Sequence, residues 1–261
     1  MNFFFRLADA LKVMIRSGRG FSSVLKKGAS VASTQVLHNC RHYIPTLNTV
    51  VDVGANKGQF TLAALHFYPQ AQVYSFEPVP DTFALLQQHT RGVSQVHAYN
   101  FALGSMSGEL EFFSNTYSHA SSALPVSELQ QHLVPQTAST HRIQVPVKRL
   151  DDLNGALPLV SPVLLKLDVQ GYEKEVLKGA ANRLRQIDYL LFETSFVHMY
   201  EGEPLFDEMH HFVKELGFEF IAPVGFLQSD KLQILQMDLL YKRKHTHTNG
   251  NSYSSSHLIK T

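Results

Sequence analysis

The central part of the chain alternates short apolar runs with segments whose apolar positions recur at helical spacing. Five runs have the length of buried strands: TVVDV (49–53), QVYSFE (72–77), SQVHAYN (94–100), VLLKLD (163–168) and YLLFET (189–194). Helical patterns occupy about 59–67, a segment starting near Pro80, 172–184 and about 205–216. Strands that alternate with helices predict a mainly parallel sheet covered on both faces. We therefore expect a doubly wound α/β fold.

The alternation is interrupted after Asn100. The run ELEFF (109–113) predicts an extra strand, and a polar stretch follows from Ser114 to Thr140. That stretch is too long for a plain connection, so it predicts a lid or substrate wall, or else a disordered insertion. Near the end, 218–223 and 237–241 are typical of a closing hairpin.

The two ends of the chain differ from this central part. Residues 1–45 carry seven Lys or Arg residues and the single acid Asp9, and apolar residues between Phe4 and Ile15 recur at helical spacing. This pattern predicts a basic amphipathic arm that packs on the domain, or contacts a membrane surface or a partner through residues 1–27. The polar residues 244–261 predict a disordered tail. The globular domain is expected over 46–243.

Composition favours an ordinary globular protein, with 44% hydrophobic and 17% charged residues and a formal net charge of +1. Cys40 is the single cysteine, so no internal disulfide can form, which favours a reducing compartment. No apolar run reaches the ~18 residues of a membrane-spanning helix, and the N-terminus lacks a signal-peptide pattern. A cytoplasmic location is therefore predicted.

A glycine loop and a distant acid form the strongest local signal. In VVDVGANKGQF, a predicted strand ends at Asp52, Gly54 and Gly58 make a turn, and a helix begins near Gln59. The next strand ends at Glu77. Adjacent parallel strands bring their carboxyl ends to one edge of the sheet, where open α/β sheets bind ligands. An acid there can accept both hydroxyls of a ribose, so the pattern predicts a nucleoside-bearing cofactor.

The loop favours S-adenosylmethionine (SAM) over a nicotinamide dinucleotide. Dinucleotide sites use Gly-x-Gly-x-x-Gly around a pyrophosphate, whereas this loop has Asn56 at the second of those glycines. SAM has no phosphate, and its amino acid end carries an ammonium group for which Asp52 is a suitable acceptor. An NAD-dependent oxidoreductase and a non-catalytic cofactor-binding module remain the alternatives. Nucleic-acid methylation lacks its Asn/Asp-Pro-Pro-aromatic signature, and the core region shows no basic, aromatic-rich surface.

Several motifs together resemble the FkbM family of SAM-dependent methyltransferases. They are VDVGANKGQFTL, FEPVPDTFALL, YNFALGSMSGELEF, VPVKRLDDL, LLKLDVQGYEKEVLKGA and LLFET, in the order of the family and covering roughly residues 45–242. The resemblance implies a class I methyltransferase fold, Rossmann-like, with seven mostly parallel strands and an antiparallel last strand. It also implies O-methylation of a hydroxyl on a sugar or secondary metabolite, so the expected partner is a small-molecule or glycan acceptor.

The resemblance also implies roles for individual residues. Asp52, Gly54, Asn56 and Gly58 are expected around the methionine part of SAM, and Glu77 is expected at its ribose. Asn100 and Ala102 are expected to flank the adenine; Asn100 stands where many methyltransferases have an acid.

Methyl transfer to a hydroxyl also needs a group that orients the acceptor or takes its proton. Asp168 ends a predicted buried strand and should face the same crevice, so we expect it to accept the proton or to orient the acceptor. His198 is the alternative base. Glu173 and Glu193 could instead serve a helix N-terminus and an ion pair with Lys166. No metal is predicted, because no dedicated ligand spacing is present.

Overall fold

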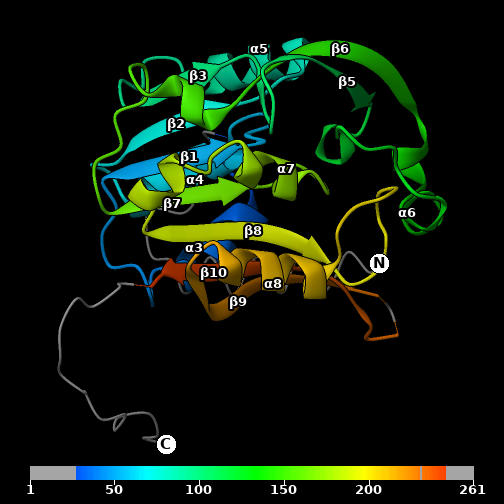
Figure 1. Ribbon diagram of the computed structural model, residues 1–261. Helices are drawn as coiled ribbons and strands as arrows, with labels where there is room; N and C mark the ends of the chain where they lie inside the picture. Colours follow the sequence, from blue (N-terminus) through cyan, green and yellow to red (C-terminus); the bar gives the residue numbers. More distant parts are fainter. Residues whose placement is uncertain (1–27, 230, 245–261) are drawn as a thin grey trace, which may run out of the picture.

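The computed structural model describes residues 28–229 and 231–244, and a seven-stranded sheet forms its centre (Figure 1). The strand order is β3-β2-β1-β7-β8-β10-β9. The strands are β1 (Thr49–Val53), β2 (Gln72–Phe76), β3 (Val96–Tyr99), β7 (Val163–Leu167), β8 (Tyr189–Ser195), β9 (Phe218–Gln228) and β10 (Ile234–Arg243). β10 runs antiparallel to both neighbours, β8 and β9, and the other pairs are parallel. The predicted fold class, including its antiparallel last strand, is confirmed.

Helices cover both faces of this sheet, as Figure 1 shows. α3 (Val31–Cys40) and α4 (Gln59–Phe67) pack on one face through an apolar cluster that includes Val50, Leu164 and Leu240. α7 (Glu173–Lys178) and α8 (Phe206–Glu215) pack on the other through a cluster that includes Val51 and Phe192. Neighbouring strand residues thus alternate between two cores, which explains why the strands read as continuous apolar runs. α5 (Pro80–His89) follows β2.

A smaller sheet stands beside the carboxyl ends of β1 and β2. Its order is β4-β6-β5, from β4 (Ala102–Leu103), β5 (Gly108–Asn115) and β6 (Thr140–Lys148). The polar stretch 114–140 between β5 and β6 contains η1 (Ser118–Ala120), α6 (Glu128–Leu133) and η2 (Pro135–Ala138), so it is not a structureless insertion. Two further 3-10 turns, η3 (Leu150–Leu153) and η4 (Arg183–Gln186), complete the described elements.

The packed domain begins earlier than the predicted boundary at residue 46. α3 lies inside the predicted arm, yet Val36, Leu37 and Cys40 are buried against the sheet. Ser30 starts this helix, because its Oγ accepts a hydrogen bond from Ser33 N at 3.0 Å, as an N-cap residue does. The predicted amphipathic helix between Phe4 and Ile15 and the predicted tail from residue 245 lie outside the described residues.

The helix predicted over 172–184 is shorter in the structure. α7 ends at Lys178 and a separate turn, η4, follows it. Gly179 comes directly after the helix, and a Cβ atom there would lie 1.8 Å from the carbonyl oxygen of Gly104. The close contact between the two backbones therefore requires glycine at this position.

The chain reverses its direction of travel across the sheet at β1. β1 pairs with β2 on one side and with β7 on the other, although β7 comes more than a hundred residues later. In that register Asp52 stands opposite Lys166, and Val53 stands opposite Leu167. Such a switch point opens a crevice at the carboxyl ends of the strands, and ligands of open α/β sheets bind there.

Candidate functional site

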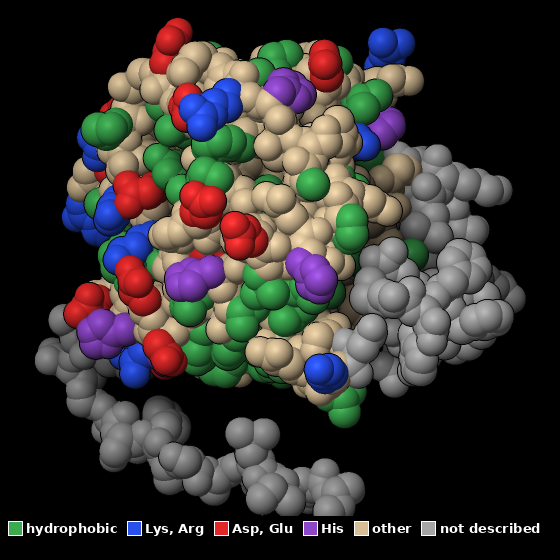
Figure 2. Space-filling model, turned by 90° about the vertical axis from the view of Figure 1, so that its right-hand side faces the viewer, with side chains coloured by type: hydrophobic (Ala, Val, Ile, Leu, Met, Phe, Trp, Pro, Cys, Tyr) green, Lys and Arg blue, Asp and Glu red, His purple; other side chains and the backbone are tan. Residues whose placement is uncertain are grey.

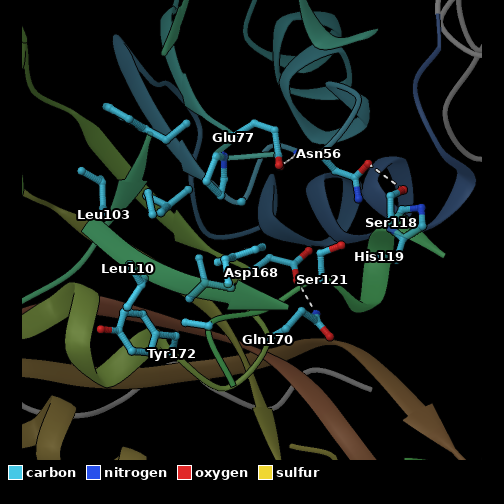
Figure 3. Close-up of a pocket in the computed structure, with 18 residues that line it drawn as sticks. Asn56, Glu77, Leu103, Leu110, Ser118, His119, Ser121, Asp168, Gln170 and Tyr172 are labelled. Carbon is cyan, nitrogen blue, oxygen red and sulfur yellow. Dashed lines mark hydrogen bonds between the residues drawn. The ribbon is translucent and has the colours of Figure 1, made fainter. Parts of the chain in front are cut away.

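A cavity opens at this switch point, between the loops that follow β1, β2 and β7 (Figure 3). It encloses about 620 Å³, part of it open to solvent. Apolar side chains from β2, β4 and β5 form one wall, among them Phe76, Leu103 and Leu110. Polar groups are contributed by Asn56, Glu77, Asp168 and the segment 118–121. An apolar wall with a few converging polar groups is typical of a site for a small organic molecule.

The glycine loop after β1 forms the floor of the cavity. Gly54 has a φ of +77°, and its amide donates to the Phe76 carbonyl at 3.0 Å. A Cβ atom on Gly54 would lie 1.9 Å from the carbonyl oxygen of Asp168, so the loop can approach β7 only with glycine here. Asn56 also has a positive φ, of 50°, which asparagine tolerates better than most residues. This tight turn brings the backbone of residues 54–56 to the cavity.

Glu77 follows β2 and places a buried carboxylate beside this loop. Its Oε2 accepts from Asn56 N at 3.0 Å, and its Oε1 accepts from Val79 N at 2.9 Å. Burial raises the pKa of Glu77 to about 7, against the effect of these two hydrogen bonds, which favour the charged form. Asn100 steadies the same turn, because its Nδ2 donates to the carbonyl oxygens of Glu77 and Pro78.

Asp52 does not line the cavity, although the sequence placed it at the methionine end of the cofactor. Its side chain is fully buried on the α4 side of the sheet. There its carboxylate accepts from Lys166 Nζ at 2.9 Å and from Thr61 Oγ1 at 2.7 Å. The strand period of two explains the direction: Val53 and Asp52 point to opposite faces, and Val53 is the one that reaches the cavity. The geometry gives Asp52 a supporting place beneath the loop.

Asp168 follows β7 and does line the cavity, with 43% of its side chain exposed. Its Oδ1 accepts from Gln170 Nε2 at 2.6 Å, and its Oδ2 lies 3.6 Å from Lys166 Nζ. Gln170 Nε2 also donates to Glu193 Oε2 at 3.0 Å, and Tyr200 OH donates to Gln170 Oε1 at 2.6 Å. The Asp168 carboxylate is therefore held in place from two sides.

A lid formed by residues 114–123 covers the cavity and is tied to both loops beneath it. Ser118 Oγ donates to Asn56 Oδ1 at 3.1 Å, which connects the lid to the glycine loop. Ser122 Oγ donates to the Gln170 carbonyl at 2.7 Å, which connects it to the loop after β7. Asn115 Nδ2 donates to the Thr137 carbonyl, which connects the lid to η2. The lid thus lies between the glycine loop and Asp168, and Figure 3 shows Ser118 and His119 near Asn56, and Ser121 near Asp168.

The structure brings together only some of the residues that the sequence predicted. Gly54, Asn56, Glu77, Ala102 and Asp168 line one cavity. Asp52, Gly58 and Asn100 support its loops without lining it; Gly58 starts α4 with a φ of +88°.

His198 lies outside the cavity. Its side chain is exposed, and its carbonyl accepts from Ser127 Oγ. This position gives it no path to an acceptor bound beside Asp168.

Sequence reasoning missed Ser118, His119 and Ser121 as members of the site. The one signal was the length of the polar segment, which predicted a lid or wall without indicating which of its residues reach the cavity. Lys166 carried a clearer signal, since a charged residue inside a buried strand needs a partner. That partner is Asp52 and not Glu193.

The described part of the chain contains neither a cluster of metal ligands nor a membrane-spanning helix. Among residues 28–229 and 231–244, no three His, Cys, Asp or Glu side chains converge as metal ligands would. No helix in the same residues is long and apolar enough to span a membrane. Figure 2 views the molecule from the side of the carboxyl ends of the strands, and its coloured surface mixes acidic, basic, histidine and apolar side chains.

The strand order, together with the cavity at the switch point, is that of a class I methyltransferase domain. The chain belongs to the FkbM methyltransferase family: the model described as Methyltransferase FkbM domain matches residues 52–220. The family resemblance noted from the sequence motifs is thereby confirmed.

Three curated relatives show where the similarity lies. Methyltransferase 1 of Beauveria bassiana is 37% identical over 147 residues, which are 52% of this chain and 59% of that protein. Hexuronic acid methyltransferase AglP of Haloferax volcanii is 30% identical over 145 residues, 54% of each chain. The 2-O-methyltransferase NoeI of Sinorhizobium fredii is 27% identical over 162 residues, 59% of this chain and 66% of that one. The similarity thus spans between about half and two thirds of these relatives.

Proposed function

We propose that this protein is a SAM-dependent O-methyltransferase that methylates a hydroxyl group of a sugar or a secondary metabolite. Membership of the FkbM family supports the reaction class. The names of two relatives, a 2-O-methyltransferase and a hexuronic acid methyltransferase, support an oxygen atom of a sugar as the acceptor. The cytoplasmic location expected from the single cysteine stays a prediction.

The observation that carries the choice of cofactor is the Glu77 carboxylate beside the glycine loop. It accepts from Asn56 N, an amide that a dinucleotide site would offer to its pyrophosphate. A carboxylate at that amide repels a diphosphate but suits a ribose diol, whose hydroxyl groups donate to it. The neighbouring apolar side chains Phe76, Ala102 and Leu103 fit the faces of an adenine ring. The residues of the cavity therefore fit SAM better than NAD.

SAM supplies an activated methyl group on its sulfonium, so the protein has to bind and orient the two reactants. Gly54, Asn56 and Glu77 would hold the cofactor, with Ala102 against its adenine. Asp52 and Gly58 would fix the loop from below, and Asn100 would fix the turn that carries Glu77. Asp168 would accept a hydrogen bond from the acceptor hydroxyl and point its oxygen at the methyl group.

A thermal-shift series with SAM, S-adenosylhomocysteine, NAD and NADP tests the cofactor. A ligand at about 100 times its Kd adds roughly 2.7 kcal/mol of stability, which raises the midpoint of a domain of this size by roughly 5–11 °C. We expect a shift with the first two ligands only. A shift with NAD alone would contradict the choice of SAM and favour the oxidoreductase, and no shift with any of the four ligands would favour the non-catalytic module.

The substitution Asp168→Ala tests the acceptor side of the same proposal. We expect loss of methyl transfer while the Kd for SAM, measured by calorimetry, stays within about twofold, because the glycine loop and Glu77 are untouched. Retained turnover would remove Asp168 from the reaction. Loss of SAM binding would show that its role is structural instead.

A further inference from the structure

His119 lines the same cavity as Asp168, and it comes from the lid and not from the sheet. It belongs to η1 and lines the cavity together with Ser118, Ser121 and Asp168. The lid is fixed over the cavity by the hydrogen bonds from Ser118 to Asn56 and from Ser122 to the Gln170 carbonyl. These bonds fix the segment that carries the ring beside the loop proposed for the cofactor, and the ring lines the same cavity as Asp168.

The contacts of the ring define which of its nitrogens is free to take a proton. His119 Nε2 lies 3.5 Å from Gln59 Nε2. The amide oxygen of Gln59 is occupied, because it accepts from Lys57 N at 3.1 Å. The Gln59 NH₂ group therefore faces the ring as a donor, which favours a lone pair on His119 Nε2 and a ring proton on Nδ1. At 3.5 Å this contact is weak, so an acceptor hydroxyl that donates to Nε2 replaces little.

The surroundings of His119 favour the neutral form of its ring, because burial is the largest influence on its pKa. Partial burial lowers the pKa of His119; Lys57 and Lys166 lower it further, and Asp168 acts in the opposite direction. A neutral imidazole can accept a proton, whereas an imidazolium cannot. The outer side of His119 is exposed to solvent, which gives the proton a way out after the reaction.

We propose that His119 Nε2 is the base that removes the proton from the acceptor hydroxyl, while Asp168 orients that hydroxyl. This inference rests on the proposed methyltransferase function. In the step, the acceptor oxygen forms a bond to the methyl carbon as its O–H bond breaks and the proton passes to His119 Nε2. The carbon–sulfur bond breaks at the same time, and its electron pair stays on the sulfur, which becomes a neutral thioether. The imidazolium then releases the proton to water at the mouth of the cavity.

The protonation state of His119 can be measured without any acceptor. In the ¹⁵N-labelled protein saturated with S-adenosylhomocysteine, the ring signals are assigned by their loss in His119→Gln. We expect a neutral ring at pH 7 with its proton on Nδ1, and a pKa below the ordinary histidine value. A ring that is protonated at pH 7, or that carries its proton on Nε2, would overturn the proposal.

The second measurement is methyl transfer from labelled SAM to a panel of methyl glycosides with free hydroxyls. Typical contributions of a general base predict that His119→Gln lowers kcat roughly 10²–10⁴-fold, with the Kd for SAM within about twofold. The matched control is His198→Gln, outside the cavity, which should keep the wild-type rate. The wild-type rate should rise with pH through the pKa of His119, and this rise should be absent in His119→Gln. Wild-type rates in His119→Gln would overturn the assignment.

Gln59 provides a variant that changes the base without removing it. Gln59→Glu places an acceptor at His119 Nε2, which favours a proton on that nitrogen and should raise the pKa of the ring. Gln59→Leu removes the contact and leaves Nε2 free. We expect the first change to slow transfer and to shift its pH profile to higher pH, and the second to leave that profile in place. Equal profiles for the two variants would contradict the proposed role of Nε2.

Failure of the underlying function gives a different result from failure of this inference. A protein that binds no SAM refutes the methyltransferase itself. A protein that binds SAM but methylates no glycoside refutes the carbohydrate acceptor, and the ring measurement then decides the assignment of His119 by itself.

Discussion

Lys166 Nζ donates a 2.9 Å hydrogen bond to Asp52 Oδ1, and both side chains are buried. The two residues stand opposite each other on β7 and β1, the strands between which the cavity opens. Burial by itself would lower the pKa of Lys166, but Asp52 and Asp168 outweigh it and the pKa is raised. Lys166 Nζ also lies 3.3 Å from the Gly54 carbonyl. One ammonium group thus holds the glycine loop and the loop of Asp168 in register.

Removing only one partner of this ion pair should lower the free energy of unfolding more than removing both partners. Lys166→Met leaves the Asp52 carboxylate buried without its charge partner, which typically lowers the free energy of unfolding by about 3–5 kcal/mol. The double variant Asp52→Asn, Lys166→Met removes both charges and should recover much of that loss. Urea denaturation of the wild type, of the single variants Lys166→Met and Asp52→Asn, and of the double variant measures the coupling. Additive losses in the double variant would show that the pair is not energetically connected.

A side chain at Gly54 should be more destabilising than one at Gly92, because only at Gly54 does the Cβ atom collide with a neighbouring backbone. Gly54 and Gly92 have nearly the same φ, +77° and +78°, but a Cβ on Gly54 would collide with the Asp168 carbonyl and one on Gly92 would meet nothing within 4 Å. Gly92→Ala should therefore cost only the backbone strain, about 1–2 kcal/mol. Gly54→Ala should cost more in a denaturation experiment and should also weaken SAM binding. Equal costs and equal SAM affinities would contradict the close approach.

Glu77→Gln should weaken SAM binding without unfolding the protein. The amide keeps one oxygen acceptor but loses the charge, and a hydrogen bond to a charged group is worth roughly 1.5–3 kcal/mol, or about 10- to 100-fold in Kd. Calorimetry measures this change. Glu111→Gln serves as the control, because Glu111 is exposed on the face of β5 opposite to Leu110 and Phe112. An unchanged Kd in Glu77→Gln would place the ribose elsewhere.

The raised pKa of Glu173 predicts that the folded protein loses stability as the pH rises. It is buried, its Oε1 accepts from Val169 N at 3.0 Å, and burial raises its pKa to about 8. Because an unfolded glutamate titrates near ~4.3, the native state binds this proton more tightly. Its contribution to stability is complete below pH ~4.3 and is lost as the pH rises through about 8.

Melting temperatures of the wild type and of Glu173→Gln between pH 5 and 8.5 test this sign. Glutamine keeps the acceptor for Val169 N and cannot ionise. The wild type should lose stability relative to the variant as the pH rises. Parallel curves would show that Glu173 titrates in the folded protein as it does in water.

The elements predicted well are those at which several local signals agree. The run 49–53 and the helix 59–67 match β1 and α4, since apolar period, glycine loop and helix start agree there. α3 was missed because basic residues on both sides of it resemble a solvated arm, although Val36 and Leu37 are buried. β6 was missed because only alternate residues of it are buried and it pairs with β5 far outside the main sheet.

Site residues too were easier to predict where their position follows from the local sequence than where it depends on contacts with distant segments. Glu77 and Gly54 are marked by their positions directly after strands, and both line the cavity, while their contact with a cofactor stays a prediction. Asp52 is the last residue but one of β1. The direction of its side chain depends on which of two neighbouring residues faces the cavity, and that choice follows from packing on α4. His119 carries no local signal, because its place depends on two hydrogen bonds that the lid makes with distant loops.

Asn56 is bonded to both sides of the cavity at once: its backbone amide to Glu77 and its side-chain oxygen to Ser118. A cofactor that contacts Glu77 and an acceptor that contacts the lid are therefore joined through a single residue. Coupled binding equilibria are reciprocal. If the cofactor changes the affinity for the acceptor by some factor, the acceptor changes the affinity for the cofactor by the same factor. Through its bonds to Glu77 and Ser118, Asn56 can couple the affinity for one reactant to the binding of the other.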